Sequence, residues 1–386
     1  MDLSYILNEL GEDREHYYNA VSPPIIQSSN FTFNTVAEIR HALADEFEGN
    51  LYSRGNNPTV DILRKKLAAL DHAEDALIFS SGVAAITVPL LALLKSGDHV
   101  IAVKSGYSWT MRFFREFLSK FGVETTFVDG NIFQNFESAA QYNTKLIFLE
   151  SPNTFTYELQ DIKQVAAFAK TRNIITLIDN SYCSAIYQKP ILHGIDLVCQ
   201  SATKYIGGHS DVMAGVLTGS RQLIKQIFSN EFMNIGAVVS PHSAWLLLRG
   251  LRTLPLRLSR SYATTQIITE WLSNHNAVET VIWPFASTFP QKALAQQQME
   301  GCGGLFSFTL KHSSFQKIEE FCNKLKHILL AVSWGGHESL VMPAISGISQ
   351  NSYEQTNRHH QLIRMYVGLE DPAYLIDDLQ QALSTV

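Results

Sequence analysis

Cysteine is scarce in this sequence: the 386 residues contain four, at Cys183, Cys199, Cys302 and Cys322. They form no C-x-x-C pair and show no spacing typical of zinc ligands. This scarcity disfavours a disulfide-stapled secreted scaffold and a structural zinc module. We therefore expect reduced, mostly buried thiols in a cytoplasmic protein, with no metal site.

A charge excess of one sign and long apolar runs are also missing. The net charge is −6 and no Lys/Arg-rich run stands out, which disfavours binding to nucleic acid through a basic face. The longest apolar stretch, residues 83–94, is too short to span a bilayer. The N-terminal segment is acidic and polar, whereas a signal peptide would be basic and then apolar. We therefore expect a cytoplasmic protein with a small-molecule substrate and with neither nucleic acid nor membrane as a partner.

The patterning that is present predicts an α/β fold in three parts. Residues 1–54 show weak periodicity and read as an extended N-terminal arm without a core of its own. In residues 55–244, short apolar runs alternate with amphipathic segments, which favours a mostly parallel sheet covered on both faces. Residues 245–386 change in composition and predict a second, smaller C-terminal α/β domain. The strands expected in the larger sheet are 75–79, 99–103, 124–129, 145–150, 174–179, 196–200 and 216–219.

Three helical expectations accompany these strands. A helix should begin near Thr59, because Pro58 suits a first helical turn. One long helical stretch is expected over residues 244–272, followed by a strand at 305–310 and a terminal helix through 375–383.

Three polar strings fall where predicted strands end. They begin at Glu150, Asp179 and Ser201. Ligands of open α/β sheets bind beyond the carboxyl ends of the strands, so these strings are expected to share one site. If residues 201–204 continue as a strand, the hydroxyls of Ser201 and Thr203 face one way and Lys204 faces the other.

Lys204 and Asp179 together indicate a particular cofactor chemistry. A lysine after a strand is by itself more often a surface residue. A pyridoxal phosphate (PLP) enzyme, however, needs a lysine for the Schiff base and an acid against the pyridine nitrogen. Two weaker signals agree: Gly82 lies at a strand–helix turn where an anion could bind, and Tyr107 could stack on a flat ring.

Taken together, the motifs of this chain resemble the Cys/Met-metabolism (trans-sulfuration) family of PLP enzymes. The matching strings span nearly the whole chain and include YSRGNNPT (52–59), SSGVAA (80–85), ESPNT (150–154), DNSY (179–182), SATKYIGGHSD (201–211), SWGGHESL (333–340) and RMYVGLED (364–371). The resemblance implies a PLP fold-type I, aspartate aminotransferase-like architecture.

The resemblance also implies roles for single residues. Lys204 would carry the cofactor, Asp179 would pair with the pyridine nitrogen and Asn153 would approach the phenolic oxygen of the ring. Tyr107 would stack over the ring and take part in proton transfer. The phosphate would be held by Gly82, Val83, Ser201 and Thr203.

Further roles concern the substrate and a second subunit. Tyr52 and Arg54 would reach the phosphate site of a neighbouring subunit. The expected assembly is therefore at least a dimer, and a tetramer is usual in such families. Arg364 would bind the substrate α-carboxylate through its planar fork, with Ser333 and Trp334 beside it.

The choice among members of the family rests on a few positions. γ-Acting relatives usually carry a glutamate before the serine of the S-x-G-G string and often an acid before Tyr-x-Arg, whereas this chain has Val332 and Leu51. Trp334 is similar to bacterial cystathionine β-lyases. The sequence thus favours β-elimination of L-cystathionine to homocysteine, pyruvate and ammonia. The alternatives are a γ-acting lyase or synthase of the same family and, remotely, a non-catalytic PLP-binding protein.

Overall fold

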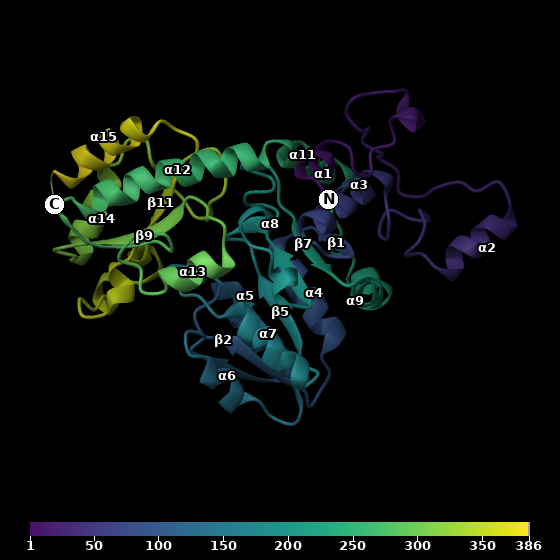
Figure 1. Ribbon diagram of the computed structural model, residues 1–386, viewed down its shortest axis with the longest axis horizontal. Helices are drawn as coiled ribbons and strands as arrows, with labels where there is room; N and C mark the ends of the chain where they lie inside the picture. The colour runs from purple at the N-terminus through teal and green to yellow at the C-terminus, as the bar shows by residue number, and fades with distance from the viewer. Residues whose placement is uncertain (385–386) are drawn as a thin grey trace.

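The short apolar runs form a seven-stranded sheet in the computed structural model, which describes residues 1–384 (Figure 1). The strand order is β1-β7-β6-β5-β4-β2-β3. Strand β7 runs antiparallel to β1 and β6, and the remaining pairs are parallel. The predicted mostly parallel sheet is therefore confirmed. Its strands are β1 (Asp75–Phe79), β2 (His99–Val103), β3 (Glu124–Val128), β4 (Thr144–Glu150), β5 (Ile175–Asp179), β6 (Leu197–Gln200) and β7 (Gly215–Gly219).

Helices cover both faces of this sheet. Val100 and Ala102 of β2 belong to one buried cluster with α4 (Gly82–Leu93) and α9 (Arg221–Ile227). Their neighbours Ile101 and Val103 belong to another with α6 (Phe133–Ala139) and α7 (Ile162–Thr171). Since successive strand residues point to opposite faces, strands buried on both sides must be apolar throughout, and this is why they appear as continuous runs in the sequence.

A second sheet lies towards the C-terminus, in the order β10-β11-β12-β9-β8 (Figure 1). Its strands are antiparallel except for the β10–β11 pair. The strands are β8 (Val278–Ile282), β9 (Leu305–Leu310), β10 (Leu329–Leu330), β11 (Leu340–Pro343) and β12 (Ile363–Tyr366). The helices of this part are α12 (Leu254–Ser273), α13 (Lys292–Gln298), α14 (Phe315–Lys324) and α15 (Pro372–Leu383).

The single helical stretch expected over residues 244–272 is wrong, because it is two helices. Helix α11 (Pro241–Arg252) ends before Thr253, and α12 begins at Leu254. Pro255 occupies the first turn of α12. Proline has no N–H to donate and its ring crowds the preceding turn, so a continuous helix is broken there. The helix expected near Thr59 does form, as α3 (Pro58–Leu70), with Pro58 in its first turn.

The N-terminal segment is partly tied to the body and partly free of it. Helix α1 (Leu3–Asn8) packs near α3, whereas α2 (Val36–Ala44) projects from the molecule and buries none of its residues (Figure 1). The remaining short helices are α5 (Ser108–Arg112), α8 (Ser184–Tyr187) and α10 (Met233–Ile235), with π turns at Phe113–Phe117 and Phe228–Phe232 and 3₁₀ turns at Arg14–Tyr17, Leu118–Phe121, Pro190–His193, Ala344–Gly347, Gln350–Ser352 and Arg358–Gln361. Within residues 1–384, no helix is long and apolar enough to cross a membrane.

Candidate active site at the carboxyl ends of the parallel strands

Strands β4, β5 and β6 end side by side, and their polar strings meet there. Glu150 and Asp179 are register partners at the ends of β4 and β5. The Ser181 hydroxyl, which follows β5, accepts a hydrogen bond from the Ser201 amide after β6 at 2.6 Å. Strand β6 ends at Gln200, where the predicted strand 196–200 also ends, so the alternating arrangement considered for residues 201–204 does not form. The Lys204 amide donates to the Ser201 carbonyl at 3.0 Å, so the chain turns back there.

Lys204 contacts the loop at 333–336. Its Nζ donates a short hydrogen bond to the Ser333 hydroxyl and lies 5.4 Å from the centre of the Trp334 ring. Gly335, at φ +93°, lets this loop approach, because a Cβ there would lie 2.9 Å from the Lys204 backbone. Burial, and then the charge of Arg364, lower the pKa of Lys204 to about 8. The amine is thus prepared to act as a nucleophile or base far below the usual lysine range.

Two carboxyl groups lie at the ends of β4 and β5, and Asp179 is close enough to Lys204 for their charges to interact. The Asp179 Oδ1 accepts from the Ser181 amide at 2.9 Å. Burial, followed by the charge of Asp179, raises the pKa of Glu150 to about 8, and burial raises the pKa of Asp179 as well. The charge of Lys204 acts on Asp179 in the opposite direction, favouring its carboxylate. Asp179 is therefore the one of the pair suited to face a cationic ring nitrogen.

Glu150 links two loops of the site. Its Oε2 accepts from the Tyr107 amide at 2.6 Å, and its Oε1 accepts from the Thr154 amide at 2.9 Å and the Thr154 hydroxyl at 2.7 Å. We assigned it no role from sequence, although its position beside Asp179 at a strand end was a usable signal. It fixes the backbone of Tyr107, whose side chain is 41% exposed and whose pKa is raised by burial.

The N-terminus of α4 has backbone amides that could bind an anion. Ser81 caps the helix by accepting from the Ala84 amide at 3.2 Å, which leaves the first-turn amides of Gly82 and Val83 available. A Cβ at Gly82 would lie 2.8 Å from the Ser201 hydroxyl, so only glycine permits this approach. The Thr203 hydroxyl is less free, since it donates to the Ala214 carbonyl at 3.2 Å and accepts from the Ala214 amide at 3.0 Å.

Asn153 is engaged within its own loop. Its Nδ2 donates to Glu158 at 3.0 Å, and its Oδ1 accepts from the Thr156 hydroxyl and the Glu158 amide. An approach to the ring oxygen must use its remaining N–H. The neighbouring Phe155, which no sequence signal singled out, lies instead against Arg364.

Arg364 is a buried cation without an anion. It is 8% exposed, and its side chain makes one hydrogen bond among residues 1–384, to the Met342 sulfur at 3.2 Å. A thioether is a weak acceptor, and no salt bridge to Arg364 forms in that part of the chain. A buried guanidinium normally requires a charged or hydrogen-bonded partner, so this one is suited to a bound carboxylate.

Tyr52 and Arg54 lie apart from these residues, on the arm. Both line a hollow of about 480 Å³ together with Phe31, Phe33 and Ile39. The Arg54 guanidinium lies 5.6 Å from the centre of the Tyr52 ring and makes no salt bridge or side-chain hydrogen bond to any residue that the structure describes. One chain does not bring this pair to Lys204.

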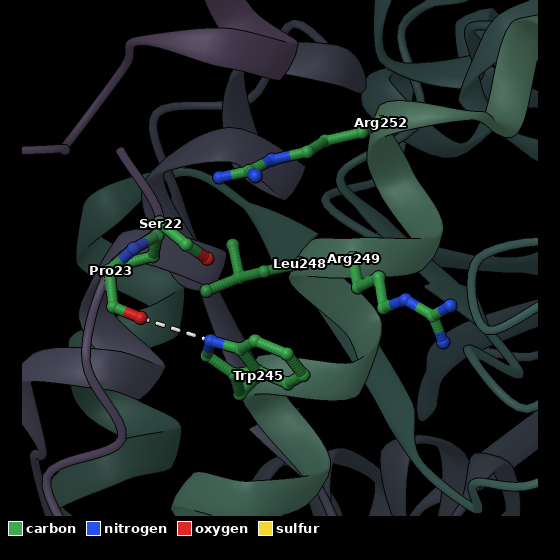
Figure 2. Close-up of a pocket in the computed structure, with 6 residues that line it drawn as sticks. All are labelled: Ser22, Pro23, Trp245, Leu248, Arg249 and Arg252. Carbon is green, nitrogen blue, oxygen red and sulfur yellow. Dashed lines mark hydrogen bonds between the residues drawn. The ribbon is translucent and has the colours of Figure 1, made fainter. Parts of the chain in front are cut away.

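A separate cavity of about 210 Å³ lies between the N-terminal segment and α11 (Figure 2). Trp245 Nε1 donates to the Pro23 carbonyl at 2.9 Å across it, and Arg249 and Arg252 line it. It contains none of the predicted site residues. Within residues 1–384, no group of three or more His, Cys, Asp or Glu side chains could hold a metal ion.

The assembled residues fit PLP. A half-buried lysine amine, a carboxylate suited to a ring nitrogen, and helix amides beside a glycine that admits no Cβ lie together at one edge of the sheet. When bound, this cofactor supplies an electron sink for charge that develops on an amino-acid substrate.

Comparisons with known proteins agree with this fit. The chain is 38% identical over 379 residues to an L-methionine gamma-lyase of Pseudomonas putida, covering 97% of this chain and 95% of the relative. It is also 38% identical over 379 residues to a cystathionine gamma-lyase of Sus scrofa, covering 97% of this chain and 91% of the relative. The crystal structure of metB from Corynebacterium glutamicum matches with a TM-score of 0.91 and 32% identity, over 100% of this chain and 98% of that one. Residues 6–384 match the model of one family, and the chain belongs to it: the Cys/Met metabolism PLP-dependent enzymes.

Proposed function

We propose that this PLP-dependent carbon–sulfur lyase acts at Cγ of L-methionine, converting it with one water to methanethiol, 2-oxobutyrate and ammonia. The observation that carries the γ assignment is the likeness over 97% of the chain to relatives named L-methionine gamma-lyase and cystathionine gamma-lyase. This revises the preference for β-elimination that the sequence suggested.

The uncharged substrate side of the site supports methionine in particular. Leu51, Val332 and Trp334 stand where the resemblance places substrate-side residues, and none carries a charge. The distal ammonium and carboxylate of cystathionine need polar partners when they leave water, whereas the thioether of methionine does not.

The roles proposed for single residues follow from their surroundings. Lys204 Nζ, once deprotonated above its pKa of about 8, accepts the substrate Cα proton. The Arg364 fork binds the α-carboxylate, and Ser333 orients Lys204 through their hydrogen bond. The raised pKa of Tyr107 keeps its phenol protonated and able to donate to a departing thiolate.

The cofactor contacts are proposed as the resemblance implies them. Asp179 faces the ring nitrogen and Asn153 the ring oxygen, while Gly82, Val83, Ser201 and Thr203 hold the phosphate. Tyr52 and Arg54 complete the phosphate site of a second subunit, so the active form is at least a dimer, with a tetramer expected. The arm at 1–54 and the boundary near residue 245 remain proposed divisions of the chain, and a cytoplasmic location remains a proposal as well.

A β-lyase acting on L-cystathionine is the second candidate. It is favoured by Val332, which replaces the usual acid of γ-acting relatives, and by Trp334, which lies 5.2 Å ring to ring from Tyr205 beside Lys204. A non-catalytic PLP-binding protein is disfavoured, because Lys204, Asp179 and Arg364 are all present and converge on one site.

Identifying the keto acid tests these alternatives. PLP-loaded protein is incubated separately with L-methionine and L-cystathionine, and the products are separated and identified. We expect 2-oxobutyrate with methanethiol from methionine. Pyruvate with homocysteine from cystathionine, and no reaction with methionine, would replace our proposal by the β-lyase. A Lys204→Ala control should form no keto acid from either substrate.

A further inference from the structure

Phe155 occupies a backbone conformation that aromatic residues rarely adopt. Its φ is +71°, in the left-handed region, and Tyr157 two residues later is also left-handed at +55°. Such conformations are costly for residues with a Cβ and persist where the surrounding structure holds them. Here the loop is held at Thr154 by two hydrogen bonds to Glu150 and at Tyr157 by its hydroxyl, 3.2 Å from that of Ser307.

The strained loop places the Phe155 ring against the candidate carboxylate receptor. The Arg364 guanidinium carbon lies 4.9 Å from the centre of that ring. Phe155 also contacts His359, with 5.6 Å between ring centres. An aromatic ring binds a guanidinium through its flat face, whereas a carboxylate binds the N–H groups along its edge. Ring and carboxylate therefore use different parts of Arg364 and do not compete.

We propose that Phe155 is a positioning residue for the substrate α-carboxylate, whose ring covers one face of the Arg364 guanidinium, excludes water from it and orients the N–H edge towards the substrate. Removing water from one face strengthens the attraction of the edge for a carboxylate. It also offsets part of the cost of burying a cation that lacks an anionic partner in the absence of substrate. This inference rests on the proposed function, because it takes Arg364 as the carboxylate receptor.

The test measures binding of a carboxylate that cannot react. Methylthiopropanoate, which is methionine without its amine, is titrated into PLP-loaded protein by calorimetry. Phe155→Leu keeps an apolar side chain at the same backbone angle but loses the ring face, and we expect it to weaken binding roughly three- to thirty-fold. Phe155→Tyr retains the ring face and should bind within about twofold of the wild type.

Two further variants separate this role from a structural one. Phe155→Asn relieves the left-handed strain while losing the ring contact, so it should fold with about the stability of the wild type yet bind as weakly as Phe155→Leu. Tyr142→Leu changes an aromatic side chain that is 99% exposed and should alter nothing. With L-methionine as substrate, the Leu and Asn variants should raise KM with little change in kcat, because the ring contributes to binding and not to the reacting atoms.

Several results would overturn the proposal. Wild-type binding by both the Leu and Asn variants would show that the ring face does nothing for Arg364. Absence of methylthiopropanoate binding by the wild-type protein would remove the carboxylate receptor itself. Neither result depends on turnover. If the Leu and Asn variants bind methylthiopropanoate weakly but the wild-type protein forms no keto acid, the proposed function is wrong and the role of Phe155 still holds.

Discussion

At the scale of single residues, the Glu150 carboxyl group connects two loops of the site, because it accepts hydrogen bonds from Tyr107 and from Thr154. Glu150→Gln should weaken PLP binding about 5- to 100-fold, because the new amide would point an N–H at the Tyr107 amide and leave that donor without its acceptor. The dissociation constant is measured by titrating the apo-protein with PLP and following its visible absorbance.

The matched control for this prediction is Asp129→Asn. Asp129 also follows a strand of the parallel sheet, but its carboxylate pairs with Lys104 at 2.6 Å, and both side chains are partly exposed. Its loss should leave PLP binding unchanged. Equal weakening in both variants would mean that charge alone, and not the contact with Tyr107, is responsible.

Sequence reasoning found the residues whose chemical type is itself the signal. A lysine and an aspartate at neighbouring strand ends indicated the cofactor, and the structure brings Lys204 and Asp179 close enough that each charge affects the pKa of the other. It did not find Phe155, because its role depends on a left-handed backbone and on packing against a strand about 200 residues later. Nor could it show that the hydrogen bonds of Asn153 and Thr203 are largely used within their own loops.

At the scale of elements, the buried ammonium of Lys66 on α3 fixes α1 and the segment after it. The Lys66 ammonium lies 3.1 Å from the Glu12 carboxylate and donates to the carbonyls of Ile6 and Leu7, in the last turn of α1. The side chains of Lys66 and Glu12 are 1% and 0% exposed. Lysine at this place satisfies carbonyls that a helix end leaves unpaired.

Lys66→Met should therefore destabilise the protein by about 1–3 kcal/mol, because it leaves the buried carbonyls of Ile6 and Leu7 without their donor. Glu12 keeps Arg14 at 2.9 Å and Arg252 at 3.4 Å, so its charge is not left unpaired. Urea unfolding followed by circular dichroism measures the loss. Lys65→Met is the control, since Lys65 is the neighbouring lysine in an exposed pair with Asp61 and its loss should cost less than about 1 kcal/mol. A similar loss in both variants would argue against the buried ammonium as the cause.

The ends of a strand were predictable where polar residues flank an apolar run on both sides. The strands predicted at residues 75–79, 99–103 and 305–310 coincide with β1, β2 and β9. The predictions failed where a single residue or a turn interrupts the hydrophobic periodicity. Pro255 divides the one predicted helical stretch into α11 and α12, and residues 201–204 turn back after β6 instead of continuing as a strand. Periodicity reports which face is buried, and it is insensitive to such single breaks.

At the scale of the whole molecule, the arm carries Tyr52 and Arg54 away from the site of its own chain. If a second subunit supplies this pair, two inactive variants should complement each other. Lys204→Ala lacks the reactive amine, Arg54→Ala lacks the arm guanidinium, and a hybrid dimer has one site with both. Mixing equal amounts after reversible dissociation should restore roughly a quarter of wild-type activity, because random pairing gives half hybrids with one intact site each.

Activity is measured as keto acid formed, alongside the molecular mass in solution. Lys204→Ala mixed with Asp179→Asn is the control, because both changes lie in the same site and no hybrid contains an intact one. No recovery in the Arg54 mixture, despite verified hybrids, would place Tyr52 and Arg54 outside the partner's site.

The burial of the four thiols has a consequence for a protein whose proposed product is itself a thiol. Cys183, Cys199, Cys302 and Cys322 are all free and buried, and burial raises the pKa of each, to about 12 for Cys322. Mixed disulfides form through a thiolate that can be reached. If an external oxidant converted released methanethiol to dimethyl disulfide, that disulfide would find no accessible cysteine thiolate to attack it on the folded subunit. The enzyme would therefore not be inactivated by its own oxidised product.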